Sequence, residues 1–79
     1  MGGIWIETKE RERIDLAAGI QKTFSASIYV KVEHGSFYEE YATEANRDRA
    51  WEMLEKAIAY GARLFRFPTD AELEKGEDE

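Results

Sequence analysis

The chain of 79 residues has 17 acidic and 11 basic side chains, a net charge of -6 and 43% hydrophobic residues, and it contains no cysteine. This length allows one domain with a small core, and the lack of cysteine excludes disulfides and thiolate metal sites. No apolar run approaches the ~20 residues of a membrane span, and Met1–Gly3 show no signal-peptide pattern, so we expect a cytoplasmic protein.

The first predicted strand covers residues 3–9. Its even positions are Ile4, Ile6 and Thr8, whereas Trp5 stands among polar residues at the odd positions. Alternate side chains of a strand point to opposite faces of the sheet. The pattern therefore places Ile4 and Ile6 in the core and Trp5 on the other face.

A second strand is expected at residues 13–16, after the charged connection 10–12. We place Ile14 and Leu16 on its core side. Two alanines and Gly19 follow, and this run of small residues predicts that the strand ends there.

Residues 20–32 again have mostly apolar side chains at their even positions, including Phe24 and Ile28. This alternation indicates one core-facing side along the whole stretch. It is compatible with one long bent strand or with two strands separated near residues 25–27, because boundaries are the weakest part of such a prediction.

A β-hairpin is predicted over residues 28–41, with His34 and Gly35 as its two-residue loop. This register pairs Val32 with Phe37 and places the apolar side chains of both strands on the core side. Lys31 lies directly opposite Tyr38 in this register. The side chains that project from the other face are Tyr29, Lys31, Tyr38 and Glu40.

One long helix is predicted at residues 44–60. Thr43 has the side chain of an N-cap, and Gly61 suits the left-handed position that ends a helix. Arg47 and Arg49 oppose the helix dipole near its start, and we expect neighbouring acidic residues to compensate. The stripe expected to cover the sheet is Ala50, Trp51, Leu54, Ala57 and Ile58.

The chain is expected to return as a last strand at residues 62–67, with Phe65 and Phe67 facing inward. Thr69 and Glu72 then form a capping-box sequence for a short helix. Residues 69–79 contain six acidic residues and one lysine, a balance of -5, so residues 1–68 carry only -1. The acidic end is therefore a separate feature of the chain.

Together these elements predict an α+β fold. We expect a single domain at residues 1–68, in which an antiparallel β-meander of four to five strands is packed on one face by a single α-helix. A short C-terminal helical turn and an acidic tail, residues 69–79, follow it.

Three segments resemble the short uncharacterised proteins of bacteriophages and mobile elements. They are the opening Gly3–Lys9, the strand Ile14–Leu16 and the step from Tyr41–Glu44 into the helix. The resemblance implies a small viral accessory protein, some of which interfere with host defence. It assigns no functional residue.

The sequence shows no catalytic set. His34 is the only histidine and cysteine is absent, and we interpret His34 as a turn residue. The carboxylates follow no pattern that separates a general acid from a base. We therefore predict a protein that is not an enzyme and has no cofactor and no metal.

The exposed aromatic residues carry the functional prediction. Large aromatic side chains beside charges on an open sheet face are typical of a subunit or partner interface, of a stacking platform for bases, or of packing that shields the sheet. We favour a homo-oligomeric, phage-type anti-defence factor that contacts a host protein. The predicted binding residues are Trp5, Tyr29, Lys31, Tyr38, Arg63 and Arg66.

The alternative is a protein that sequesters a small cyclic nucleotide at a subunit interface. Its bases would stack on the tyrosines, and its phosphates would bind Arg63 and Arg66. Nucleic acid is disfavoured as a partner, because eleven acidic residues match ten basic residues even without the tail.

Overall fold

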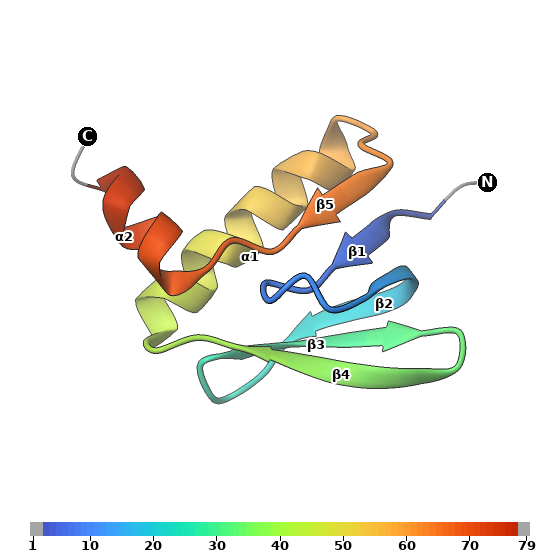
Figure 1. Cartoon of the computed structure of the whole chain (residues 1–79), viewed down its shortest axis with the longest axis horizontal. Coiled ribbons are helices and arrows are strands. Elements are labelled where there is room, and N and C mark those ends of the chain that lie inside the picture. The colour runs from blue at the N-terminus through green and yellow to red at the C-terminus, as the bar shows by residue number, and fades with distance from the viewer. Residues whose placement is uncertain (1–2, 78–79) are drawn as a thin grey trace.

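A computed structural model describes residues 3–77 and shows a five-stranded sheet with two helices (Figure 1). The strand order is β4-β3-β2-β1-β5. In chain order the elements are β1 (Trp5–Glu7), β2 (Ile14–Lys22), β3 (Ser27–Val32), β4 (Gly35–Glu40), α1 (Glu44–Ala59), β5 (Leu64–Arg66) and α2 (Asp70–Glu77). Residues 1–2 and 78–79, which include the last two acids of the predicted tail, lie outside the described residues.

The sheet is mixed. Strands β1 to β4 pair antiparallel with their neighbours, but β5 runs parallel to β1, with Ile6 beside Phe65. Helix α1 returns the chain to the end of the sheet where β1 starts, so β5 begins beside β1 and runs in the same direction. The α+β class is confirmed, whereas the purely antiparallel sheet was wrong.

The core lies between the inner face of the sheet and α1. Ile6, Ile28 and Val30 are completely buried on the sheet, and Leu54 of α1 packs against them. As predicted, Trp5 points to the opposite, outer face and is 47% exposed.

Strand β2 continues through its small residues because it contains a β-bulge between Ala17 and Gly19. The extra residue shifts the alternation, so the inward side chains are at odd positions before the bulge and at even positions, such as Ile20, after it. Ile14 and Leu16 therefore lie on the outer face, 52% and 38% exposed, and their assignment to the core was wrong. The strand ends at Lys22, so residues 20–32 form two strands.

The β3–β4 hairpin turns at residues 33–34, and Val32 pairs with Gly35 instead of Phe37. Gly35 has a φ of 156°, which side-chain-bearing residues rarely adopt. The register therefore differs by two residues from the prediction. A shift of two leaves every side chain on its predicted face and changes only its cross-strand partner.

Helix α1 begins and ends at the predicted signals. The hydroxyl of Thr43 accepts the N–H of Asn46 at 3.1 Å, and Gly61 follows the helix with a φ of 76°. Ala50 and Leu54 are buried, but Ile58 at the end of the predicted stripe is 46% exposed. The helix thus packs on the sheet mainly through its first three turns.

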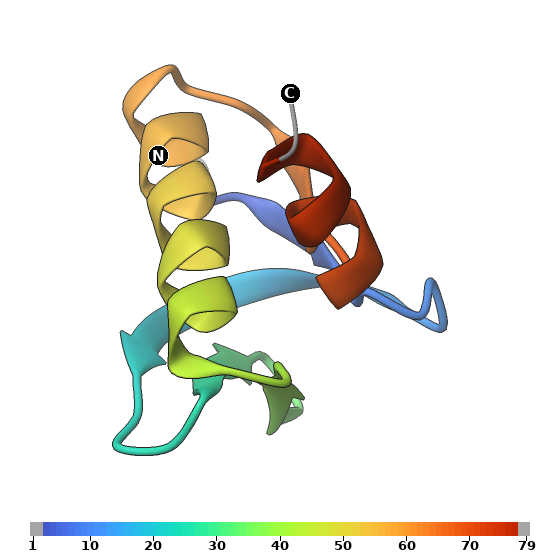
Figure 2. The ribbon, with the colours of Figure 1, turned by 90° about the vertical axis from the view of Figure 1, so that its left-hand side faces the viewer.

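Helix α2 packs beside α1 (Figure 2). Its capping box is formed, since the Glu72 N–H donates to the Thr69 hydroxyl and the Thr69 N–H donates to the Glu72 carboxylate. Leu73 is buried in the core. In the part of the chain that the structure describes, neither helix is long and apolar enough to cross a lipid bilayer.

Candidate binding surfaces

An apolar row crosses the outer face of the sheet over β5, β1 and β2. Trp5 pairs with Leu64 on one side and with Leu16 on the other, and all three side chains are 38–50% exposed. Ile14 lies beside them in the next row of residues. Neighbouring strands are about 4.8 Å apart, so these four side chains form one continuous patch, here called the apolar row.

Opposite charges flank the apolar row. Arg66 pairs with Glu7 across β5 and β1, and its guanidinium lies 3.6 Å from the Glu7 carboxylate. Arg63, also a predicted binding residue, precedes β5, and its carbonyl oxygen accepts the N–H of Trp5. One cation and one anion therefore stand together at the edge of the patch.

Two tyrosines form an aromatic pair at the other end of the sheet. Tyr29 lies directly opposite Tyr38, with their ring centroids 5.2 Å apart. The prediction that Lys31 faces Tyr38 was wrong, because the hairpin register pairs Lys31 with Ser36. The tyrosines line a pocket of 490 Å³ together with Phe24 on the β2–β3 loop.

Phe24 stands fully in solvent, although its position in the alternation predicted a place on the core side. The loop that carries it is held by hydrogen bonds. The hydroxyl group of Thr23 bonds with the Ser27 hydroxyl at 2.7 Å and with the Ser25 hydroxyl at 3.1 Å. Ser and Thr side chains can bond to neighbouring backbone groups and so favour turns, and three of them within residues 23–27 could have separated the loop from the strands.

Arg47 fixes the same loop from the helix side. Its guanidinium donates to the carbonyl oxygens of Thr23, Ser25 and Ser27 at 2.8, 2.8 and 3.3 Å, and to the Asp48 carboxylate. The side chain is buried, which no local pattern in the sequence signals. Arg47 is therefore the residue that positions Phe24, and it was not among the predicted binding residues.

The predicted binding residues fall into two groups. Trp5, Arg63 and Arg66 lie at the β1–β5 end of the sheet, whereas the two tyrosines and Lys31 lie on β3 and β4. The strand order separates β3 from β5 by three strand spacings, roughly 14 Å. A single chain therefore does not bring the tyrosines and these arginines to one small ligand.

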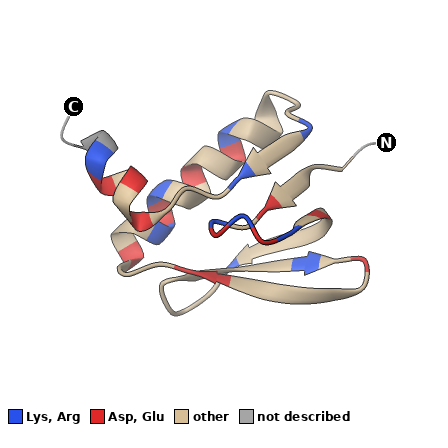
Figure 3. Ribbon diagram, viewed as in Figure 1, with Lys and Arg blue, Asp and Glu red and all other residues tan. Residues whose placement is uncertain are grey.

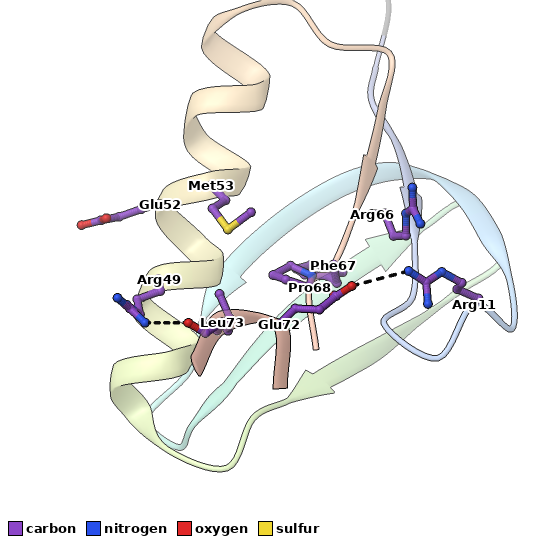
Figure 4. Close-up of a pocket in the computed structure, with 9 residues that line it drawn as sticks. All are labelled: Arg11, Arg49, Glu52, Met53, Arg66, Phe67, Pro68, Glu72 and Leu73. Carbon is purple, nitrogen blue, oxygen red and sulfur yellow. Dashed lines mark hydrogen bonds and ion pairs between the residues drawn. The ribbon is translucent and has the colours of Figure 1, made fainter. Parts of the chain in front are cut away.

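A cleft of 630 Å³ opens where both helices approach β5 and the β1–β2 connection (Figure 4). Its apolar lining includes Phe67, Pro68 and Leu73. Three arginines also line it: Arg11, Arg49 and Arg66. Such a volume is within the range of small-molecule sites.

The charges around this cleft are connected through Glu72. Arg11 lies 3.8 Å from its carboxylate, and Arg49 donates to the Leu73 carbonyl oxygen at 3.0 Å. The Thr69 N–H lowers the pKa of Glu72, and the charges of Arg11 and Arg66 add to this effect against a smaller opposing contribution from burial. The charges of Arg11 and Arg66 therefore both act on the Glu72 carboxylate. Figure 3 shows residues of both signs side by side on the helices and on the β1–β2 connection.

Comparison of the chain with protein-family models, curated proteins and solved structures found no match. Among residues 3–77, no three His, Cys, Asp or Glu side chains are grouped as metal ligands.

Proposed function

We propose that this protein is a non-enzymatic binding protein that contacts another protein through the outer face of its sheet. The observation that carries this proposal is Phe24, a completely exposed aromatic ring on a loop held by Arg47 and by three hydroxyl side chains. Exposing such a ring to water costs roughly 1.5–3 kcal/mol relative to burying it. A loop held in place cannot fold back to bury the ring, so it presents a pre-organised anchor.

The partner we propose is a host protein with an apolar pocket for the Phe24 ring. Aromatic anchors that enter pockets are typical hot spots of protein interfaces. The neighbouring Tyr29 and Tyr38 extend the contact along the sheet, as aromatic residues commonly do in interfaces. A phage-type accessory role that interferes with host defence, in line with the sequence resemblance, is the biological setting of this proposal, and its location is the cytoplasm.

The test is capture from a bacterial host lysate on the immobilised protein. We expect one protein at constant stoichiometry, and we expect Phe24→Ser to weaken its binding about 30-fold, as loss of a hot spot does. Tyr60→Ser is the matched control. Tyr60 is an aromatic residue that is 88% exposed, but it lies at the C-terminal end of α1 and not on the β2–β3 loop. The captured protein is then purified and titrated. Equal affinity for the wild type and Phe24→Ser would reject the proposal.

We also propose that a second copy of this chain covers the apolar row. The charges beside the row are self-complementary, because a two-fold axis can place Arg66 of each copy against Glu7 of the other. The row lies over β5, β1 and β2, so a dimer through it leaves β3 and β4, which carry the tyrosines, uncovered for the partner protein. Self-association also compensates for a small core.

Light scattering tests this second contact. We expect a dimer for the wild type and a monomer for Trp5→Ala, because Trp5 is the centre of the row. Tyr38→Ala should remain dimeric, since Tyr38 lies on the far strand β4. A monomeric wild type, or a dimer that tolerates Trp5→Ala and loses mass with Tyr38→Ala, contradicts the assignment.

A further inference from the structure

We propose that the cleft between α1, α2 and β5 binds a small organic phosphate with a flat apolar body, such as a nucleotide. The phosphate lies between Arg11 and Arg66, and the body lies on the apolar lining formed by Met53, Phe67 and Pro68. The cleft lies on the helix side of β5 and shares Arg66 with the edge of the apolar row. Three features of the cleft support this site: the backbone of Arg11, the arginine side chains at its mouth and the apolar lining.

Arg11 has a φ of 58°, the left-handed region that normally favours glycine or asparagine. Such a conformation costs roughly 1–2 kcal/mol for a residue with a Cβ. Backbone strain of this kind is a pointer to function when the side chain has a use at that position. Here the side chain reaches the mouth of the cleft, where it faces Glu72 (Figure 4).

Two guanidinium groups come together at this mouth without tight partners. Arg11 lies 3.8 Å from Glu72, and Arg66 lies 3.6 Å from Glu7, so both ion pairs are longer than hydrogen bonds. Both arginine side chains are about half exposed. Their N–H donors are therefore accessible to a ligand, and two convergent arginines suit the several oxygens of a phosphate.

Glu72 acts as an internal competitor for this site. One of its oxygens accepts the Thr69 N–H, which keeps the carboxylate in place, while the other faces Arg11. The cleft is thus lined by three arginines and by two carboxylates, those of Glu52 and Glu72. A bound phosphate carries a larger charge than Glu72 and replaces it as the partner of Arg11. Removing the charge of Glu72 should therefore strengthen phosphate binding.

The lining explains why the phosphate should have an apolar body. Phe67 and Leu73 are buried, whereas the Met53 side chain above them is 45% exposed. Methionine adapts to flat ligands through its flexible thioether. An inorganic anion would leave this part of the cleft unused.

The test is isothermal titration with adenosine 5′-monophosphate, inorganic phosphate and adenosine. We expect the monophosphate to bind at least tenfold more tightly than either of the others. Arg66→Gln should weaken its binding about tenfold or more, as loss of a charge-assisted hydrogen bond does. Arg11→Gly should do the same while it relieves the backbone.

Two further variants make the test independent of folding. Glu72→Gln keeps a capping-box residue and should bind the monophosphate several-fold more tightly. Arg63→Gln is the matched control and should bind like the wild type, because Arg63 does not line the cleft. Absence of binding at millimolar concentration, equal binding of inorganic phosphate, or weaker binding by Glu72→Gln would each overturn the proposal.

Discussion

Arg47 and Glu39 are charged residues that the fold places in its interior, where each has to find partners. Arg47 bonds to three carbonyl oxygens of the β2–β3 loop. Glu39 accepts the N–H of Lys9 at 2.7 Å. Both residues connect segments that are at least twenty positions apart in the chain. At the scale of single residues, the stability of the fold and the position of the β2–β3 loop depend on these contacts.

We predict that Arg47→Met lowers the free energy of unfolding by about 2–4 kcal/mol, because hydrogen bonds to a charged group contribute about 1.5–3 kcal/mol each and water replaces part of this. Arg47→Lys should lose less stability, since the three donors of the lysine ammonium group can still bond to carbonyl oxygens of the loop. Urea unfolding of both variants measures the difference. Equal losses would mean that the apolar stem of Arg47, and not its hydrogen bonds, stabilises the loop.

The buried carboxyl group of Glu39 should make the stability of the fold depend on pH. Burial raises the pKa of its carboxyl group above the ordinary 4.5, with Glu10 and Glu12 adding to the effect and Lys9 opposing it. A group with a raised pKa stabilises the fold below the unfolded pKa, and this contribution is lost as the pH rises through the folded pKa. Glu39→Gln should therefore gain stability relative to the wild type as the pH rises above the ordinary pKa of 4.5. Urea unfolding at several pH values measures this gain, and a gain that is constant or falls with pH would contradict the assignment.

At the scale of elements, the two helices have similar caps but different positions in the structure. Thr43 caps α1, which carries the buried Ala50 and Leu54, whereas Thr69 caps α2, which reaches the core mainly through Leu73. The same local interaction should therefore affect global unfolding in one helix and local opening in the other.

We predict that Thr43→Ala lowers the global free energy of unfolding by about 1 kcal/mol, the usual effect of losing an N-cap. Thr69→Ala should leave it nearly unchanged and accelerate amide exchange in α2. Urea unfolding combined with hydrogen exchange at the Leu73 amide, which donates to the Thr69 carbonyl oxygen, distinguishes the two effects. A global loss of equal size in both variants would show that α2 unfolds together with the rest.

At the scale of the whole molecule, the accessible surface is large for the chain. It amounts to 5518 Å², compared with roughly 4,900 Å² expected for a folded monomer of 9.1 kDa. The difference agrees with a sheet whose outer face has no covering layer in the single chain.

We predict that the melting temperature rises with protein concentration, because a dimer is stabilised by mass action. A tenfold increase in concentration should raise it by about 3–5 °C for a domain of this size. Trp5→Ala should show no such rise. Scanning calorimetry at two concentrations tests this prediction, and a constant melting temperature for the wild type would exclude the dimer.

Local chemistry was sufficient for most of the elements. The caps at Thr43 and Thr69, the helix end at Gly61 and the outward direction of Trp5 follow from interactions within a few residues, and the structure confirms them. The two tyrosines also share a face as predicted, because a register shift of two residues preserves it.

The tertiary structure alone decided what depends on contacts distant in sequence. The bulge in β2 sent Ile14 and Leu16 outward and thereby completed the apolar row, although a constant alternation had placed them in the core. Likewise, Arg47 gains its loop partners and Arg11 reaches Glu72 only after helices and loops have packed together. Alternation and capping are local and can be read along the chain, whereas one inserted residue or one long side chain acquires its role only from the packing around it.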